Sequence, residues 1–241
     1  DPKLEQVVDF GWFWFLAKPL FASLNWTNDK VVHNYGWSIV LVTVVINFLL
    51  LPLKLSSLRS AKKMQTVQPE IAAINARYKG LGLRDPRKAE QNQEVMDLYK
   101  KHGVSPLGGC MPMVVQIPFF FAFYKVLSVV IEMRGAQWLW VTDLSRPETL
   151  AIRILPITMM ATQFILQKMT PTPSADPTQA RVMLLMPLMF GFMFYGVQRG
   201  LVLYWLTGNV VGIAQQWWFN RAAAASAPPA PKPAQKKKGS R

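Results

Sequence analysis

Residues 182–218 read VMLLMPLMFGFMFYGVQRGLVLYWLTGNVVGIAQQWW, two long apolar runs separated only by Gln198-Arg199-Gly200. Each run approaches the length of about 20 residues that an α-helix needs to cross a bilayer. Because a three-residue connection leaves no room for another element, the two runs are predicted to form an antiparallel helical hairpin. This stretch favours an all-α membrane protein.

Three further apolar runs qualify as membrane spans by the same criterion of length. The five predicted spans are residues 35–53, 107–130, 152–167, 182–197 and 201–218. Five such runs in 241 residues leave too little amphipathic surface to cover them in water, which argues against the buried helices of a soluble protein. The composition agrees, because only 17% of the residues are charged, whereas a soluble domain has about a quarter.

The net charge of +14 is unevenly distributed among the segments between the spans. Lys and Arg number 19 on one side, in residues 54–104, 168–181 and 221–241, and 7 on the other side, in residues 1–34, in residues 133–153 and at Arg199. Since basic loops stay in the cytoplasm, the N-terminus is predicted to lie outside and the C-terminus in the cytoplasm. The excess of positive charge also predicts an anionic partner, either lipid headgroups or nucleic acid.

Two segments outside the spans have recognisable patterns. Residues 10–24 are rich in Trp and Phe but too short to cross, so they are predicted to lie as an interfacial helix on the outer leaflet. The alternative is an ordinary flank of the first span. Residues 221–241 are rich in Ala and Pro and end in basic residues, which predicts a disordered tail.

Residues 54–104 are predicted to form a cytoplasmic helical hairpin with a basic surface. Its first helix carries a 3, 4, 3, 4 spacing typical of a coiled-coil seam, at Met64, Val67, Ile71, Ile74 and Tyr78. Gly80-Leu81-Gly82 is expected to end that helix and Asp85-Pro86 to begin a second. The apolar residues of the second helix are Val95, Met96, Leu98 and Tyr99.

Most catalytic and metal chemistry is excluded by residues that the chain lacks. With one cysteine, Cys110, and two histidines, neither a disulfide nor a Cys/His zinc site can form. No Asp or Glu lies in a predicted span, which argues against a proton relay. Because nucleotide-binding and hydrolytic motifs are also missing, no enzyme, catalytic residue, metal site or cofactor is expected.

The predicted spans nevertheless contain many uncharged polar residues. Several of these polar residues lie near the middle of a span or in its cytoplasmic half, and they are predicted to line a hydrophilic groove. The predicted groove residues are Thr43, Asn47, Gln116, Gln163 and Gln216. The alternative is that these residues form hydrogen bonds between helices, each of small energy. Periodicity alone does not decide between the two.

Several short motifs, taken together, resemble one family. The chain carries Pro106-Leu107-Gly108-Gly109-Cys110-Met111-Pro112, then Gln116-Ile117-Pro118, Asp143-Leu144-Ser145, Gln167-Lys168-Met169-Thr170-Pro171 and Gly200-Leu201-Val202-Leu203-Tyr204. In this order and spacing they resemble the YidC family of membrane protein insertases. The resemblance covers about residues 10–221. Relatives from bacteria with an outer membrane carry an additional N-terminal span and a periplasmic domain, which this chain is expected to lack.

The resemblance implies a fold, a function and a location. The fold is a five-helix core in the bacterial inner membrane, with a groove open to the cytoplasm and to lipid. The implied function is to insert small or single-span membrane proteins, alone or with a Sec translocon, and to act as a chaperone. The implied partners are nascent membrane proteins, the ribosome with its rRNA, the signal recognition receptor and anionic lipid.

The resemblance also assigns residues to these roles. Positions on the family's substrate path are matched by Phe120, Met159, Tyr204 and Trp205. The ribosome or a targeting factor is expected to contact the basic residues of the tail, which are Lys232, Lys236, Lys237, Lys238 and Arg241.

One position departs from the family pattern. The family usually has an Arg five residues before the Pro of its Pro-Leu pair, and here Asn47 precedes Pro52-Leu53 at that distance. Because Asn carries no charge, this chain is expected to have lost any preference for acidic substrate segments. Two other functions remain open, namely a small channel or secondary transporter and a structural subunit of a membrane complex.

Overall fold

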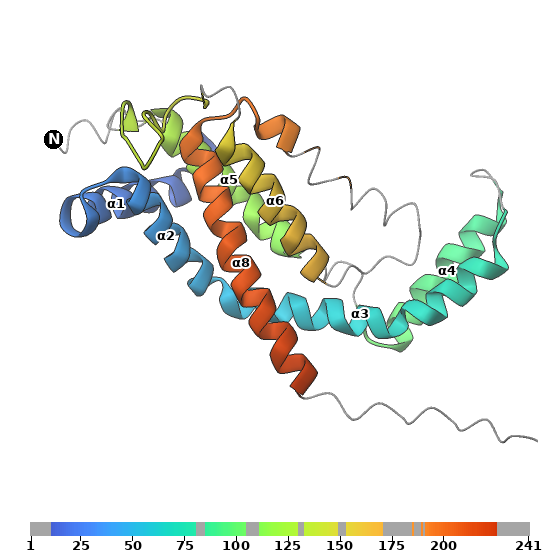
Figure 1. Ribbon diagram of the computed structural model, residues 1–241. Helices are drawn as coiled ribbons and strands as arrows, with labels where there is room; N and C mark the ends of the chain where they lie inside the picture. The colour runs from blue at the N-terminus through green and yellow to red at the C-terminus, as the bar shows by residue number, and fades with distance from the viewer. Residues whose placement is uncertain are drawn as a thin grey trace, which may run out of the picture.

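The computed structural model describes residues 11–80, 85–104, 111–129, 133–148, 153–170, 185, 189 and 191–225. Over these residues the regular structure is helical, apart from an isolated bridge between Trp138 and Val141. The predicted all-α class is therefore confirmed for the described part of the chain. Four helices form a bundle (Figure 1). These helices are α2 (Tyr35–Leu49), α5 (Met111–Val129), α6 (Ile154–Met169) and α8 (Arg199–Ala225).

Helix α8 is the central element of the bundle, because it contacts α2, α5 and α6. Its first turns bury four consecutive residues, Leu201–Tyr204. Phe123 from α5 and Met159 from α6 are equally enclosed and belong to the same apolar cluster. Burying a side chain of this size stabilises the fold by about 1.5–3 kcal/mol, so this cluster is the principal source of cohesion.

The N-terminal part of the described chain is a helix that packs beside the bundle. After a 3-10 turn, η1 (Gly11–Phe13), helix α1 (Trp14–Thr27) contacts α2 and α5. It buries one face and exposes aromatic side chains on the rest, including Trp14, Phe15 and Trp26, and Trp12 of η1 is exposed as well. The helix extends three residues beyond the predicted residue 24, and its place at a membrane interface stays a prediction.

A sharp bend joins α1 to α2. It consists of a π-helical turn, η2 (Asn28–Val32), followed by His33 in the left-handed conformation at φ 53°. Asn34 then caps α2, because its side-chain oxygen accepts a hydrogen bond from the Trp37 amide at 3.2 Å. Such a cap satisfies one of the donors that the first turn of a helix leaves unpaired.

Among the described helices, each one by itself falls short of the length and apolar composition that a membrane span requires. Trp14–Val32 and Tyr35–Leu49 meet the requirement together, as a pair bent by 115°, and Val114–Ser128 is apolar but shorter. The five predicted spans stay predictions. Most of residues 182–197 lie outside the described residues.

The predicted first span is divided by a break. Helix α2 ends at Leu49, and α3 (Leu51–Arg77) begins two residues later with Pro52 in its first turn. Because proline has no backbone N–H, the carbonyl four residues earlier loses its helical donor. Helix α3 then leaves the bundle as an arm (Figure 1).

The arm is a pair of helices, α3 and α4 (Arg87–Lys101). Met64, Val67 and Ile71 are buried on α3, and the side chains packed against this cluster include Val95, Leu98 and Tyr99 of α4. These are residues of the seam that their spacing predicts. Met96 differs from the prediction, because it is 48% exposed and lies away from the seam.

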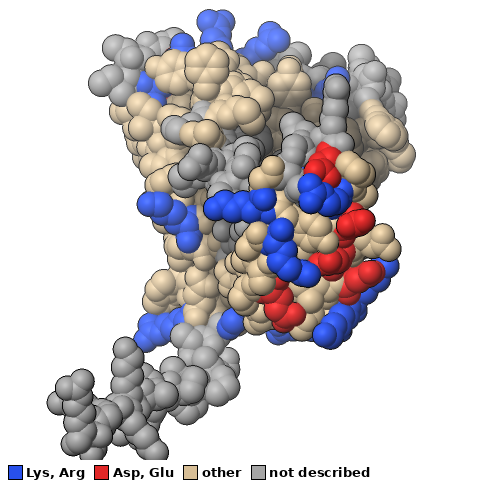
Figure 2. Space-filling model, turned by 90° about the vertical axis from the view of Figure 1, so that its right-hand side faces the viewer, with Lys and Arg blue, Asp and Glu red and all other residues tan. Residues whose placement is uncertain are grey.

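The surface of the arm carries charges of both signs rather than a uniformly basic face. Figure 2 shows acidic side chains next to basic ones on the side of the molecule from which the arm projects. The ion pairs on it include Arg77–Glu94 at 2.5 Å, Arg87–Asp85 at 2.9 Å and Lys100–Asp97 at 3.4 Å. Exposed pairs of this kind contribute about 0–1 kcal/mol each, so the apolar seam holds the arm together.

Candidate functional site

Polar side chains meet along the inner side of α8. The Gln116 amide of α5 donates a hydrogen bond to the Tyr204 hydroxyl, and the Trp205 indole N–H donates to Gln163 Oε1 of α6 at 3.1 Å. Further along α8, Asn209 Nδ2 donates to Thr162 Oγ1 at 3.3 Å. Each of these bonds joins α8 to a different point of its neighbours, so they fix the helices in register.

A second polar cluster lies where α2 meets α3. The Lys54 ammonium donates to Asn47 Oδ1 at 2.5 Å and, across the bundle, to Gln215 Oε1 of α8 at 3.5 Å. Gln215 Nε2 in turn donates to the Asn47 carbonyl at 3.3 Å. That carbonyl belongs to the last turn of α2, where backbone carbonyls lack the N–H partner that a continuing helix would provide. We call Asn47, Lys54 and Gln215 the junction cluster.

The remaining predicted groove residues bond within their own helices. Thr43 is fully buried, and its hydroxyl donates to the Ile39 carbonyl at 2.6 Å. Gln216 is 3% exposed, and its amide donates to Asn220 Oδ1 at 2.8 Å. Of the five predicted groove residues, Asn47 and Thr43 are joined, because Asn47 Nδ2 donates to the Thr43 carbonyl at 2.8 Å, whereas Gln116, Gln163 and Gln216 bond to residues outside the set. A shared water-accessible groove stays a prediction.

The four predicted substrate-contact residues pack in or against the apolar core. Met159 and Tyr204 are 1% and 3% exposed, and Tyr204 stacks on Phe123 with ring centroids 4.0 Å apart. Phe120 and Trp205 are less deeply buried and meet edge to face at 5.6 Å. A passing substrate helix would have to displace these contacts. Their role in substrate contact stays a prediction.

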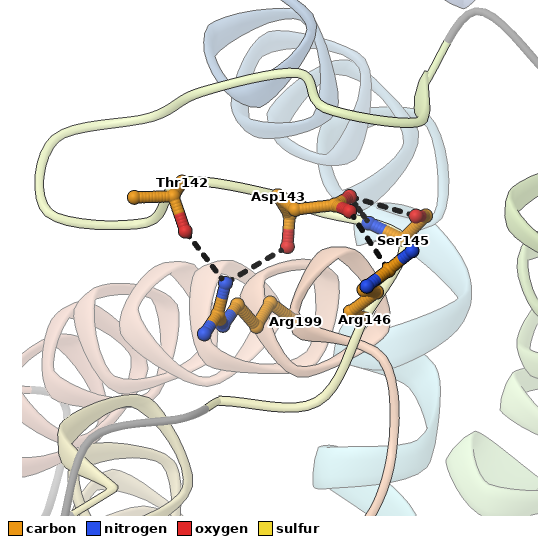
Figure 3. Close-up of polar contacts among 5 residues, drawn as sticks. All are labelled: Thr142, Asp143, Ser145, Arg146 and Arg199. Carbon is orange, nitrogen blue, oxygen red and sulfur yellow. Dashed lines mark hydrogen bonds and ion pairs between the residues drawn. The ribbon is translucent and has the colours of Figure 1, made fainter.

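Residues 133–148 form a loop that covers one end of the bundle. Arg199, at the start of α8, is 4% exposed, and its Nη1 donates to Thr142 Oγ1 at 3.4 Å and to the Asp143 carbonyl at 3.2 Å (Figure 3). The Arg199 and Gly200 amides donate to carbonyls of Arg146 and Leu144 at 3.0 and 2.8 Å. The loop therefore satisfies donors that the first turn of α8 leaves open.

Gly200 permits this close approach. A Cβ atom at that position would lie 3.2 Å from the Leu144 carbonyl oxygen and 3.0 Å from a methyl group of Leu127. The bonds to Leu144 and Arg146 could not form at their present lengths beside a larger side chain without a shift of the loop.

Asp143 holds the loop in shape. One carboxylate oxygen accepts the Ser145 amide at 2.9 Å and its hydroxyl at 2.7 Å, and the other accepts Arg146 Nε at 3.3 Å (Figure 3). Partial burial acts to raise the pKa of this carboxyl. The bonds from Ser145, the Gly135 amide and the charge of Arg146 outweigh burial and hold the pKa below its ordinary value.

The same loop reaches the first turns of two other helices. Glu148 is 3% exposed, and its carboxylate accepts the Leu155 amide of α6 at 3.0 Å and the Trp140 indole N–H at 3.2 Å. At α2, the Asn34 side chain donates to the Gln137 carbonyl at 2.9 Å. Loop 133–148 thus binds the N-terminal ends of α2, α6 and α8 together.

Metal ligation finds no support in the described part of the chain. No three His, Cys, Asp or Glu side chains of those residues lie close enough to hold an ion.

Comparison with known sequences identifies the family. Residues 26–226 match the family of the 60Kd inner membrane protein. The chain belongs to this family. Two relatives, each named membrane protein insertase YidC, are 49% identical over 224 residues in Cupriavidus metallidurans and 43% identical over 222 residues in Campylobacter jejuni. The matches cover 91% and 92% of this chain but 38% and 40% of those proteins.

A solved structure agrees with the family assignment. The fold resembles a crystal structure of an active YidC insertase with its first transmembrane domain resolved, at a TM-score of 0.65 and 26% sequence identity. The likeness covers 85% of this chain and 46% of the other. The resemblance deduced from the motifs is confirmed, and the family description places its members in the inner membrane.

One expectation about the YidC architecture is corrected. Residues 1–23 match the YidC periplasmic domain, so the chain carries part of a domain that it was expected to lack. The described part of this match, residues 11–23, forms η1 and most of α1, which contacts α5. A segment of 23 residues is too short to have the composition of a separate domain, so the composition of the chain did not indicate this part of the periplasmic domain.

Three residues important in these clusters were not among the predicted site residues. Lys54 follows Asn47 by seven positions, which is two helical turns, and that spacing could have placed its side chain on the same face. Arg199 and Glu148 meet the loop through long-range contacts. No periodic pattern could have indicated these two.

Other predicted features lie outside the described residues. They include Cys110 with the rest of residues 105–110, and the basic tail residues Lys232, Lys236, Lys237, Lys238 and Arg241. The roles proposed for them stay predictions.

Proposed function

We propose that this chain is the inserting part of a YidC protein, which moves small or single-span membrane proteins into the inner membrane. The observation that carries the proposal is the set of neutral amide side chains inside an apolar bundle, among them Gln116, Gln163 and Asn209. Each of these amides has a partner at rest, because each bonds to a residue of a neighbouring helix, namely Tyr204, Trp205 or Thr162. They can instead bond to water or to the polar backbone of a substrate when helices separate.

In this mechanism the substrate supplies the free energy. Its apolar helix gains about 25 cal/mol for each Å² of surface removed from water, so no nucleotide is required. The bundle shortens the apolar path that the polar translocated end must cross. The hydrogen bonds between α8 and its neighbours cost little to exchange, since such bonds in membranes average roughly 0.6 kcal/mol.

The loop over the helix N-termini supports a one-sided groove. By the distribution of Lys and Arg, residues 131–151 lie outside the membrane and the arm lies in the cytoplasm. Since loop 133–148 ties α2, α6 and α8 together at the outer end, opening is easier at the cytoplasmic end. Substrate would enter from the cytoplasm and leave sideways into lipid.

The proposed partners follow from this orientation. Nascent membrane proteins are the proposed substrates, and the arm and the basic tail would contact the ribosome and the signal recognition receptor. A Sec translocon would supply larger substrates, toward which the chain acts as a chaperone. Anionic lipid would contact the basic residues at the cytoplasmic surface.

Reconstitution tests the proposal. The purified chain in liposomes is offered a short single-span substrate, and protease-protected substrate is measured. Gln163→Leu, which removes an inner polar group of α6, is expected to lower the protected fraction. Thr158→Val is the matched control, because Thr158 lies on the exposed side of the same helix and its hydroxyl donates to the Ile154 carbonyl of its own helix.

The other outcomes point to other functions. Solute flux without protected substrate would indicate a channel or transporter. Neither flux nor protection would indicate a structural subunit. Equal protection by Gln163→Leu and wild type would refute a role for the polar residues of α6.

A further inference from the structure

The junction cluster contains a cation without an anion. Lys54 has three N–H donors and no acceptor, and its two partners, Asn47 and Gln215, are neutral amides. Among the described residues, every ion pair lies elsewhere, in the arm or in loop 133–148. Within the described part of the chain these two amide oxygens are the acceptors that the ammonium meets, so one of its three N–H groups can meet a further acceptor.

The ammonium is also partly desolvated. Burial lowers the pKa of Lys54 to about 8, because the charged form has lost water that two amide oxygens replace only in part. An enclosed charge of this kind is stabilised most by an opposite charge in direct contact. The cluster therefore favours a ligand that presents an anionic oxygen.

The surroundings indicate where that oxygen comes from. Phe48 and Leu49, in the last turn of α2, are 59% and 72% exposed. On α8, Trp218 lies one turn beyond Gln215 and is 57% exposed. Large exposed apolar side chains next to a cation suit the boundary between acyl chains and headgroups, where Trp side chains also concentrate.

The depth in the membrane agrees. The predicted spans 35–53 and 201–218 end within three residues of Lys54 and Gln215, so both residues lie at the same end of the bundle. By the positive-inside rule this is the cytoplasmic end, where the leaflet is rich in anionic phospholipid. A soluble anion would not explain the exposed apolar side chains on both flanks.

We propose that Lys54, held by Asn47 and Gln215, binds the phosphate of one anionic phospholipid at the seam between the α2–α3 junction and α8. The acyl chains of this lipid run along the exposed apolar side chains of α2. The bound lipid compensates the charge of Lys54 and covers the side of the bundle that the cluster closes. This inference rests on the membrane location and is independent of the insertase activity.

The test counts bound lipid by native mass spectrometry in a non-ionic detergent. Wild type, Lys54→Gln and Lys54→Arg are each titrated with phosphatidylglycerol and with phosphatidylcholine. Lys62→Gln is the matched control, because Lys62 is an exposed lysine two turns further along α3. Circular dichroism spectra establish that each variant is folded.

Wild type, Lys54→Arg and Lys62→Gln are expected to retain one tightly bound phosphatidylglycerol. Lys54→Gln is expected to bind it roughly five- to tenfold more weakly, with phosphatidylcholine binding unchanged in all four. Equal phosphatidylglycerol binding by Lys54→Gln and wild type would overturn the proposal. So would an equal loss in Lys62→Gln, which would show only diffuse attraction. If an acidic single-span peptide depended on Lys54 while phosphatidylglycerol did not, the ligand would be a peptide carboxylate instead.

Discussion

Replacing Asn47 by Leu is expected to destabilise the protein through Lys54 rather than through lost packing. Leu fills a similar volume, but the ammonium then keeps only the 3.5 Å contact with Gln215 Oε1. A hydrogen bond to a charged group contributes about 1.5–3 kcal/mol, so the free energy of unfolding should fall by about that amount. In a Lys54→Leu background the same substitution should cost little, because no cation is left without its acceptor.

The four proteins of this cycle are compared by urea unfolding in detergent micelles, followed by far-ultraviolet circular dichroism. The expected coupling energy between positions 47 and 54 is about 1.5–3 kcal/mol. A control cycle pairs Asn47→Leu with Lys62→Leu, which should be additive. A coupling between positions 47 and 54 of less than about 0.5 kcal/mol would refute the reasoning, because it would mean that the ammonium does not depend on the amide.

The structure also changes what is expected of Asn47→Arg. From the sequence, an arginine there should restore attraction for acidic substrate segments. Because Lys54 already places a positive charge beside Asn47, the guanidinium would meet a like charge, at a cost of up to about 4 kcal/mol at 4 Å. Improved insertion of acidic substrates is therefore expected in the Asn47→Arg, Lys54→Gln double variant and not in the single one.

Four further predictions concern the loop, the arm and the tail. Arg199→Ala should release loop 133–148 from α8, with faster amide hydrogen exchange at Leu144 and unchanged exchange in the arm; equal exchange would show that the backbone bonds suffice. The pKa of Asp143 is lowered on folding, so its stabilisation is complete above the ordinary carboxyl pKa and is lost as pH falls through the folded value. The protection factors of the loop amides, which are corrected for the intrinsic pH dependence of exchange, should fall in acid, and Asp143→Asn should remove that dependence. Deleting residues 61–103 with a short linker should leave a folded bundle that no longer inserts substrate, whereas full activity would make the arm dispensable. Removing residues 231–241 should reduce ribosome cosedimentation at low salt, and an unchanged yield would exclude the tail as the main ribosome contact.

Local patterns were sufficient to predict the helices and the seam of the arm. The 3, 4 spacing of Met64, Val67 and Ile71 depends only on helical geometry, and all three are buried. Glycines and a proline likewise indicated where α3 ends and α4 begins. The break at Leu50 lies inside the predicted span 35–53, because the apolar run continues through it and only Pro52, a residue expected to kink a span, interrupts the hydrogen bonds.

Partnerships between distant residues could not be predicted. A list of polar residues in spans does not say that Gln116 meets Tyr204 or that Gln163 meets Trp205, since each bond depends on how α5 and α6 pack on α8. The role of Arg199 depends in the same way on a loop more than 50 residues earlier in the chain. Polarity in a span indicates that a partner exists, and only the fold determines which residue it is.

The break at Leu50 makes α3 a lever with its pivot at the edge of the bundle. Helix α3 has 27 residues, so it is about 40 Å long, and a tilt of about 10° would displace its far end by about 7 Å. Lys54 is the fourth residue from the pivot and would move by less than about 1 Å. A tilt of α3 would therefore displace the tip of the arm by several times the movement at its base, where the hydrogen bonds of Lys54 could stay intact.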